Sequence, residues 1–117
     1  MRNLLISIIS TLTMVTGADA APVLVAVTGP DGKPLIDAVV TLDVAGTPAA
    51  VPRGPYAMAQ RNIAFAPHVL IVPVGATVSF PNQDRMRHHV YSFSTPRKFD
   101  LKLYGRDESK SVSFPKA

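Results

Sequence analysis

The 117-residue chain contains no cysteine. Its absence excludes disulfide bonds, thiolate zinc sites, iron–sulfur clusters and cysteine nucleophiles within these residues. Helical patterning is absent as well, since no segment after residue 20 repeats apolar residues with a period of about 3.6 over three turns. The 11 prolines oppose a helical bundle, and the 47% hydrophobic content opposes a disordered chain. The composition predicts one small β-rich domain, or one and a half.

Sequence motifs of catalysis are also lacking. The chain has no nucleophile elbow of the Gly-x-Ser-x-Gly kind, no phosphate-binding glycine loop and no His-Glu-x-x-His zinc motif. Neither Asp84 nor Asp100 has a second carboxylate at a spacing that suggests an acid–base pair. We therefore expect a protein that is not an enzyme.

The first 20 residues have the pattern of a secretory signal peptide. Arg2 supplies a positive charge, residues 4–15 form an apolar run, and Ala-Asp-Ala at 18–20 provides a cleavage site. About 12 apolar residues span roughly 18 Å as a helix, which is shorter than a hydrocarbon core of about 30 Å. We expect cleavage before Ala21, no stable membrane span afterwards, and a periplasmic or secreted protein.

The net charge of +4 is mildly basic, and eight basic residues lie in the last third of the chain. They are Arg85, Arg87, Arg97, Lys98, Lys102, Arg106, Lys110 and Lys116. Acidic residues are interleaved with them, whereas a nucleic-acid site would favour a denser patch with stacking aromatics. We expect no nucleic-acid partner. A solvated basic face is the simplest interpretation, and a docking surface for an acidic or redox protein partner is the alternative.

Strand patterns occur at short intervals along residues 21–117. The expected strands cover residues 23–27, 38–44, 68–74, 76–80, 88–94, 99–104 and 111–114. A turn is expected at Gly-Pro-Asp-Gly, residues 29–32, and a linker or edge loop at the Pro- and Gly-rich residues 46–55. Many short strands separated by turns predict an antiparallel sandwich or barrel.

Two adjacent histidines, His88 and His89, begin one of these expected strands. Neighbouring side chains of a strand point to opposite faces, so the two imidazoles cannot serve one mononuclear metal site without a bulge. Taken alone, such a pair is more typical of two histidines on the surface or in the core that have only structural partners. A metal role for one of them needs a further signal.

Residues 56–114 provide that signal. The motif Gly-x-x-Val-x-Phe-x-Asn-x-Asp runs from Gly75 to Asp84 and is followed by His-His-Val at 88–90. With these motifs, the segment resembles cupredoxins. More narrowly, the segment resembles the plastocyanin-like periplasmic proteins often labelled methylamine utilisation proteins. The resemblance implies an all-β, antiparallel Greek-key sandwich over residues 56–117. Residues 23–42 are similar to carboxypeptidase regulatory-like or transthyretin-like domains, which implies a small β-segment plus linker over 21–55.

The resemblance also implies copper binding and electron transfer. Blue-copper sites use two imidazoles, a thiolate and a weak axial methionine. His88 occupies the first-ligand position, while His89, Asn82 and Asp84 are expected to support the ligand from outside the metal's coordination shell.

Because the cysteine, second histidine and methionine of the family come from a later loop, we expect a domain truncated at its C-terminus and no blue-copper centre. An unpaired sheet edge would then favour self-association. Two alternatives remain: a metal-free periplasmic interaction module, and weak surface capture of copper by Met86, His88 and His89.

Overall fold

The computed structural model of the protein describes residues 21–117. Contacts divide the described residues after Pro34 into two units, residues 21–34 and residues 35–117. The predicted signal peptide lies outside the described residues. Within residues 21–117 the secondary structure is entirely β and contains no helix, so none is available to cross a membrane. The expected all-β class is confirmed for this part of the chain.

The first unit contains the expected turn. The Gly29 amide donates to the Lys33 carbonyl at 2.8 Å, the Gly32 amide donates to the Gly29 carbonyl at 3.0 Å, and Thr28 forms an antiparallel bridge with Pro34. Gly32 has a φ of 75°, a conformation that glycine adopts without strain. Residues 23–27 form no strand, contrary to the prediction, because no neighbouring strand pairs with them and their valine side chains are largely exposed.

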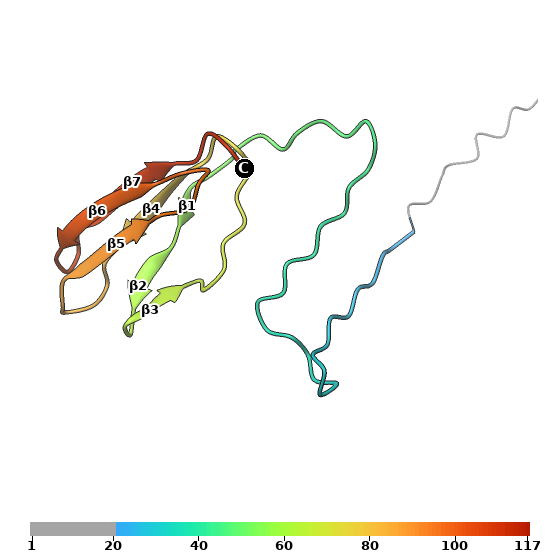
Figure 1. The fold of residues 1–117 in the computed structure, drawn as a ribbon, viewed down its shortest axis with the longest axis horizontal. Coiled ribbons are helices and arrows are strands. Elements are labelled where there is room, and N and C mark those ends of the chain that lie inside the picture. Colours follow the sequence, from blue (N-terminus) through green and yellow to red (C-terminus); the bar gives the residue numbers. More distant parts are fainter. Residues whose placement is uncertain (1–20) are drawn as a thin grey trace, which may run out of the picture. The chain divides into compact units, whose positions relative to one another are not determined.

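The second unit holds seven strands (Figure 1). They are β1 (Tyr56–Ala57), β2 (Ala59–Arg61), β3 (Ala64–Ala66), β4 (Thr77–Pro81), β5 (His88–Ser92), β6 (Phe99–Tyr104) and β7 (Ser109–Ser113). The last four confirm predicted strands, although β5 ends two residues earlier than expected and β7 begins two residues earlier.

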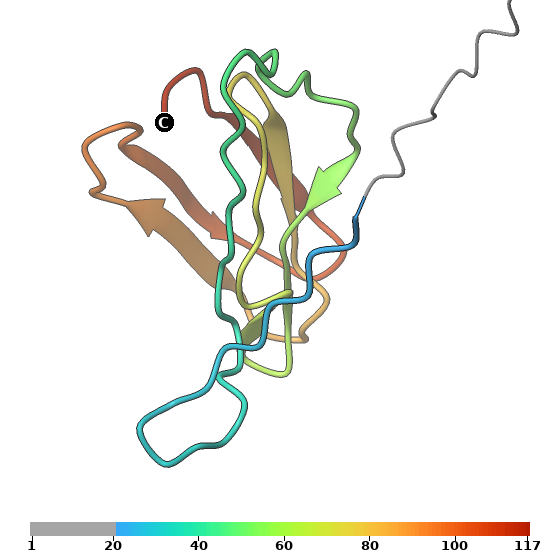
Figure 2. The same cartoon turned by 90° about the vertical axis from the view of Figure 1, so that its right-hand side faces the viewer.

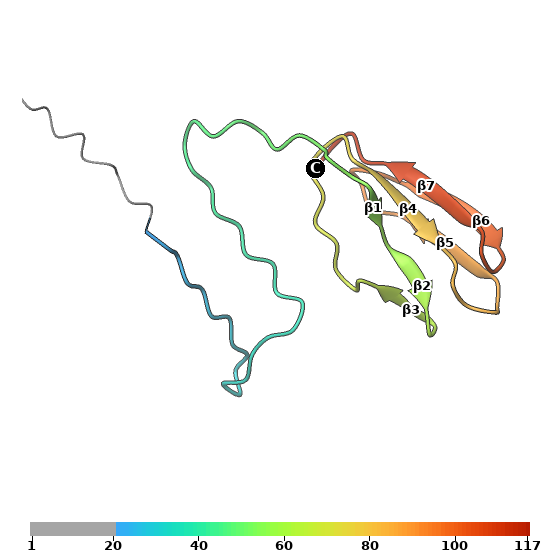
Figure 3. The same cartoon turned by 180° about the vertical axis from the view of Figure 1, so that it is seen from behind.

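Three sheets organise these strands. In the central sheet, of order β1-β4-β7, β1 runs parallel to β4 and β7 runs antiparallel to it. β5 pairs with β6, and β3 folds back antiparallel on β2 just after β1 (Figure 3). The prediction of a wholly antiparallel fold is therefore wrong in one respect. The parallel pair arises because the chain between β1 and β4 contains the β2–β3 hairpin and a long crossover segment, which brings β4 back in the direction of β1.

The core lies between the central sheet and the β5–β6 sheet (Figure 2). Its buried members come from both sheets and are Val78, Phe80, Val90, Tyr104 and Val112. Phe99 on β6 packs against Phe80 with ring centroids 5.9 Å apart and meets Phe114 edge to face at 6.1 Å. Such aromatic contacts join the two layers into a small sandwich-like domain.

Residues 38–44 and 68–74 form no strand, contrary to the prediction. In residues 68–74 the alternation of side chains is nevertheless visible, since Leu70 and Val72 pack against the core while Ile71 is exposed. The pattern therefore predicted burial but not backbone pairing. Pro73 lacks an amide for a strand ladder, and residues 38–44 have no strand beside them.

Candidate functional site

The loop from β4 to β5 is organised by Asn82. This side chain is fully buried. Its Nδ2 donates to the Met86 carbonyl at 2.8 Å and to the Tyr104 carbonyl at 3.2 Å, and its Oδ1 accepts from the Asp84 amide at 2.9 Å. Asn82 thus fixes the loop on β6 and sets the position of Asp84. Burial without these partners would carry a desolvation penalty, so the hydrogen bonds and the buried position depend on each other.

Asp84 connects the loop to the turn between β2 and β3. Its Oδ1 accepts from the Asn62 amide at 2.7 Å and its Oδ2 from the Ile63 amide at 2.9 Å. Both turn residues have positive φ, 56° and 61°, which is unfavourable for a β-branched residue such as Ile63. Hydrogen bonds from the Ile63 amide and from His88 are the main causes that lower the pKa of Asp84 from its ordinary value of 3.8. Asp84 is therefore a carboxylate at neutral pH.

His88 is the second partner of this carboxylate. Its Nε2 lies 2.8 Å from Asp84 Oδ2, and the two side chains are 17% and 13% exposed. Because a carboxylate only accepts hydrogen bonds, Nε2 carries the proton, and in the neutral imidazole Nδ1 keeps a free lone pair. Nδ1 has no hydrogen-bond partner among residues 21–117. Every fully buried side-chain nitrogen and oxygen in these residues has a partner, so Nδ1 is not fully buried. Metal-binding histidines commonly have this arrangement.

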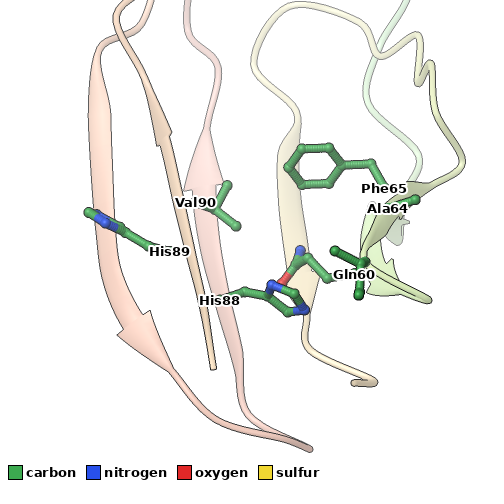
Figure 4. Close-up of a pocket in the computed structure, with 7 residues that line it drawn as sticks. Gln60, Ala64, Phe65, His88, His89 and Val90 are labelled. Carbon is green, nitrogen blue, oxygen red and sulfur yellow. The ribbon is translucent and has the colours of Figure 1, made fainter. Parts of the chain in front are cut away.

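A cavity of about 120 Å³ lies beside His88. Figure 4 shows the His88 ring between β5 and the β2–β3 hairpin, where Gln60 and Phe65 face it. The lining residues are Gln60, Ile63, Ala64, Phe65, His88, His89 and Val90. The walls are mostly apolar, so a group bound in the cavity would be partly shielded from water.

His89 is also among the residues that line the cavity, but its ring points away from His88 (Figure 4). Its Nε2 lies 2.5 Å from Asp100 Oδ1, and Lys102 Nζ lies 2.6 Å from the other oxygen of the same carboxylate. Hydrogen bonds from Lys102 and then His89 hold the pKa of Asp100 far below its ordinary value. Strand geometry predicted the separation of the two imidazoles, and the structure places them on opposite faces of β5.

The predicted site residues are therefore only partly brought together. Asn82, Asp84 and His88 form one connected network, and His89 belongs to another. Met86 contributes its backbone carbonyl to Asn82, while the residue itself is half exposed. No group of three histidine, aspartate or glutamate side chains with metal-binding geometry occurs in the part of the chain that the structure describes. The metal roles of these residues remain predictions.

Two contributions to the site were not predicted from the sequence. The Asn62–Ile63 turn supplies both amides to Asp84, and buried Gln60 accepts a hydrogen bond from Tyr104 Oη at 2.7 Å. Asparagine is frequent at turns with positive φ, so Asn62 could have been used to predict the turn between β2 and β3. The Gln60–Tyr104 contact joins residues 44 positions apart, and no local pattern marks it.

Comparison with known proteins gives no assignment. The chain matches no family model, no curated protein and no solved structure. The resemblance of the motifs between Gly75 and Val90 to cupredoxins remains a prediction.

Proposed function

We propose that this chain is an exported, cupredoxin-like protein of a class that binds copper and transfers electrons, and that His88 is its copper ligand through Nδ1. The observation that carries the proposal is the Asp84–His88 pair beside the cavity. A charged carboxylate on Nε2 fixes the imidazole in the tautomer that presents an unprotonated Nδ1. Imidazole nitrogen is a ligand that suits copper.

The local structure supports a prearranged ligand. Asn82 fixes Asp84, Asp84 fixes His88, and the Asn62 and Ile63 amides hold the other side of the carboxylate. The imidazole is therefore oriented before any metal arrives, which reduces the entropy lost on binding. Hydrogen bonds of this kind around a ligand commonly change metal affinity by about 10- to 100-fold.

The residues present do not fit a complete blue-copper centre. That centre requires a thiolate and a second imidazole in the same plane as the first. The 117 residues include no cysteine, His89 faces the other side of β5, and His68 Nδ1 is engaged with Asp37 at 2.8 Å. We therefore propose that these residues hold copper through the His88 imidazole alone, weakly and without the strong blue colour of a copper–thiolate bond.

Titration of the full chain with copper(I) tests the proposal. Binding, followed by calorimetry and by the histidine ring signals in NMR spectra, is expected to broaden or shift the His88 signals first. His88→Ala should weaken binding by at least about tenfold, and Asp84→Asn by about tenfold. Copper(II) should produce no intense blue absorption.

His89→Ala is the matched control, since His89 is the same residue type, one position away, and is also hydrogen-bonded to an aspartate. This variant should bind copper(I) like the wild type. Equal affinities of the wild type and His88→Ala would refute the proposal, as would a loss of binding in His89→Ala alone.

A further inference from the structure

The outer face of the β5–β6 sheet carries a row of three rings, His89, Tyr91 and Phe93, called here the aromatic ladder. Consecutive ring centroids are 5.2 Å apart in both pairs, within the range of favourable aromatic contacts. Leu103 of β6 pairs with His89 in the strand register and extends the row sideways. The spacing arises because alternate residues of a strand project from the same face.

This row is exposed although it is largely apolar. Tyr91 is 54% exposed, Phe93 80% and Leu103 52%. The opposite face of β5 carries His88 and the buried core residue Val90, so the ladder contributes neither to the core nor to the Asp84–His88 network. Contiguous exposed apolar surface with a polar rim is typical of interaction sites.

Basic residues lie close to the ladder in the sequence. Residues 87–104 contain Arg87, Arg97, Lys98 and Lys102 but only one acidic residue, Asp100. Lys102 and His89 both engage Asp100. Arg87, Arg97 and Lys98 form no ion pair with any residue between 21 and 117. The rim therefore has uncompensated positive charge.

We infer that the aromatic ladder and its basic rim dock an acidic protein partner. Protein interfaces combine an aromatic centre with a polar rim, and carboxylates on a partner would pair with the basic side chains that have no ion pair. Arg87 donates a hydrogen bond to the Leu103 carbonyl at 3.4 Å but keeps its charge uncompensated. An anionic membrane fits less well, because it would bring negative headgroups against Asp100, which lies on the same face opposite Tyr91 in the register. A protein partner can place its carboxylates opposite the basic residues alone. This inference is independent of copper binding by His88.

A synthetic peptide of alternating acidic and aliphatic or aromatic residues serves as the probe. With the full chain, we expect amide NMR shifts confined to residues 87–104, and affinity that falls as the salt concentration rises. The double variant Tyr91→Ser/Phe93→Ser should weaken binding by about tenfold or more, as the removal of an apolar interface centre does. Arg97→Ser/Lys98→Ser should weaken it less and flatten the salt dependence.

Three controls decide the interpretation. Leu42→Ser removes an exposed apolar side chain elsewhere and should leave the peptide affinity unchanged. A peptide with lysines in place of the acidic residues should not bind. His88→Ala should bind the acidic peptide like the wild type, so that failure of the copper proposal and failure of this one are distinguishable.

Several outcomes would overturn the inference. These are no shift in residues 87–104, an affinity indifferent to the Tyr91→Ser/Phe93→Ser change, and binding to phosphatidylglycerol–phosphatidylcholine vesicles without binding to the peptide. The last outcome would assign the face to a lipid surface instead. Proton NMR spectra of each variant establish that it is folded. None of the substituted side chains belongs to the core, and all of them except His88 are exposed.

Discussion

His88 and His89 are neighbours in sequence, each is hydrogen-bonded to an aspartate, and yet they belong to different parts of the protein. His88 faces the interior side of β5, where it is mostly enclosed and connected to the β4–β5 loop and the β2–β3 turn. His89 faces outward and joins an exposed row of rings with a basic rim. The comparison teaches that the pleat of the strand, rather than residue type or partner, decides what each imidazole can do.

The largest expected difference between the two faces concerns the effect of two phenylalanines on the free energy of unfolding. Phe80 is 5% exposed and lies in the core, whereas Phe93 is 80% exposed on the outer face. Phe80→Ala should lower the free energy of unfolding by about 3–5 kcal/mol because it removes buried surface and leaves a cavity. Phe93→Ala should change it by no more than about 0.5 kcal/mol. Urea unfolding followed by circular dichroism measures both, and similar losses in the two variants would contradict the assignment of inner and outer faces.

Two tyrosines give a finer test. The Tyr104 hydroxyl donates to buried Gln60 Oε1 at 2.7 Å, and burial raises the pKa of Tyr104 above its ordinary value of 10.0. Tyr104→Phe leaves the Gln60 oxygen without this donor and should destabilise the domain by about 1–3 kcal/mol. Tyr91→Phe removes only an exposed hydroxyl and should have almost no effect on unfolding. An unchanged unfolding midpoint for Tyr104→Phe would show that the buried hydrogen bond is replaced by another.

The smallest expected effects are those of pH and salt on the free energy of unfolding. The pKa values of Asp84 and Asp100 lie below the ordinary value of 3.8 in the folded protein, so the unfolded chain takes up these protons first as the pH falls. The stability that each carboxylate provides is fully present above about pH 3.8, the pKa in the unfolded chain. It is lost as the pH falls through the lower pKa of the folded protein. In the variants Asp84→Asn and Asp100→Asn, the free energy of unfolding should therefore decrease less steeply as the pH falls.

Salt should distinguish the two carboxylates. Asp100 is stabilised mainly by the exposed cation of Lys102, and salt screens exposed ion pairs. Asp84 is stabilised mainly by the Ile63 amide, which has no net charge to screen. The effect of Asp100→Asn on the free energy of unfolding should therefore shrink at high salt, while that of Asp84→Asn should persist. Equal salt dependence for the two variants, measured by urea unfolding at several ionic strengths, would remove this distinction.

The sequence predicted the parts of the fold that depend on local alternation. Val78 and Phe80 marked β4, Phe99 and Leu101 marked β6, and the Gly-Pro-Asp-Gly turn was found at residues 29–32. The parallel pairing of β1 with β4 was not predictable, because β1 has only two residues and its partner follows 20 residues later. Alternation without a neighbouring strand, as in residues 23–27, produced no strand.

The candidate site was predicted to a similar extent. Strand geometry separated His88 from His89, and the loop residues Asn82 and Asp84 were singled out through the family resemblance. The role of Asp84 in joining the β2–β3 turn to His88 was not foreseen, because its amide partners lie 21 and 22 positions earlier in the chain. Contacts over such separations follow from tertiary packing and leave no periodic trace in the sequence.

The Asp84 carboxylate contacts both the His88 ring and the β2–β3 turn, and this double contact makes events at His88 detectable by spectroscopy. Asp84 contacts the His88 ring with one oxygen, Oδ2, that also accepts from the Ile63 amide, and its other oxygen accepts from the Asn62 amide. Any event at the imidazole, whether protonation or ligand binding, changes the electron density on this carboxylate and hence the strength of both amide hydrogen bonds. The backbone amide signals and hydrogen-exchange rates of Asn62 and Ile63 should therefore register occupancy of His88 without any probe being attached to the site.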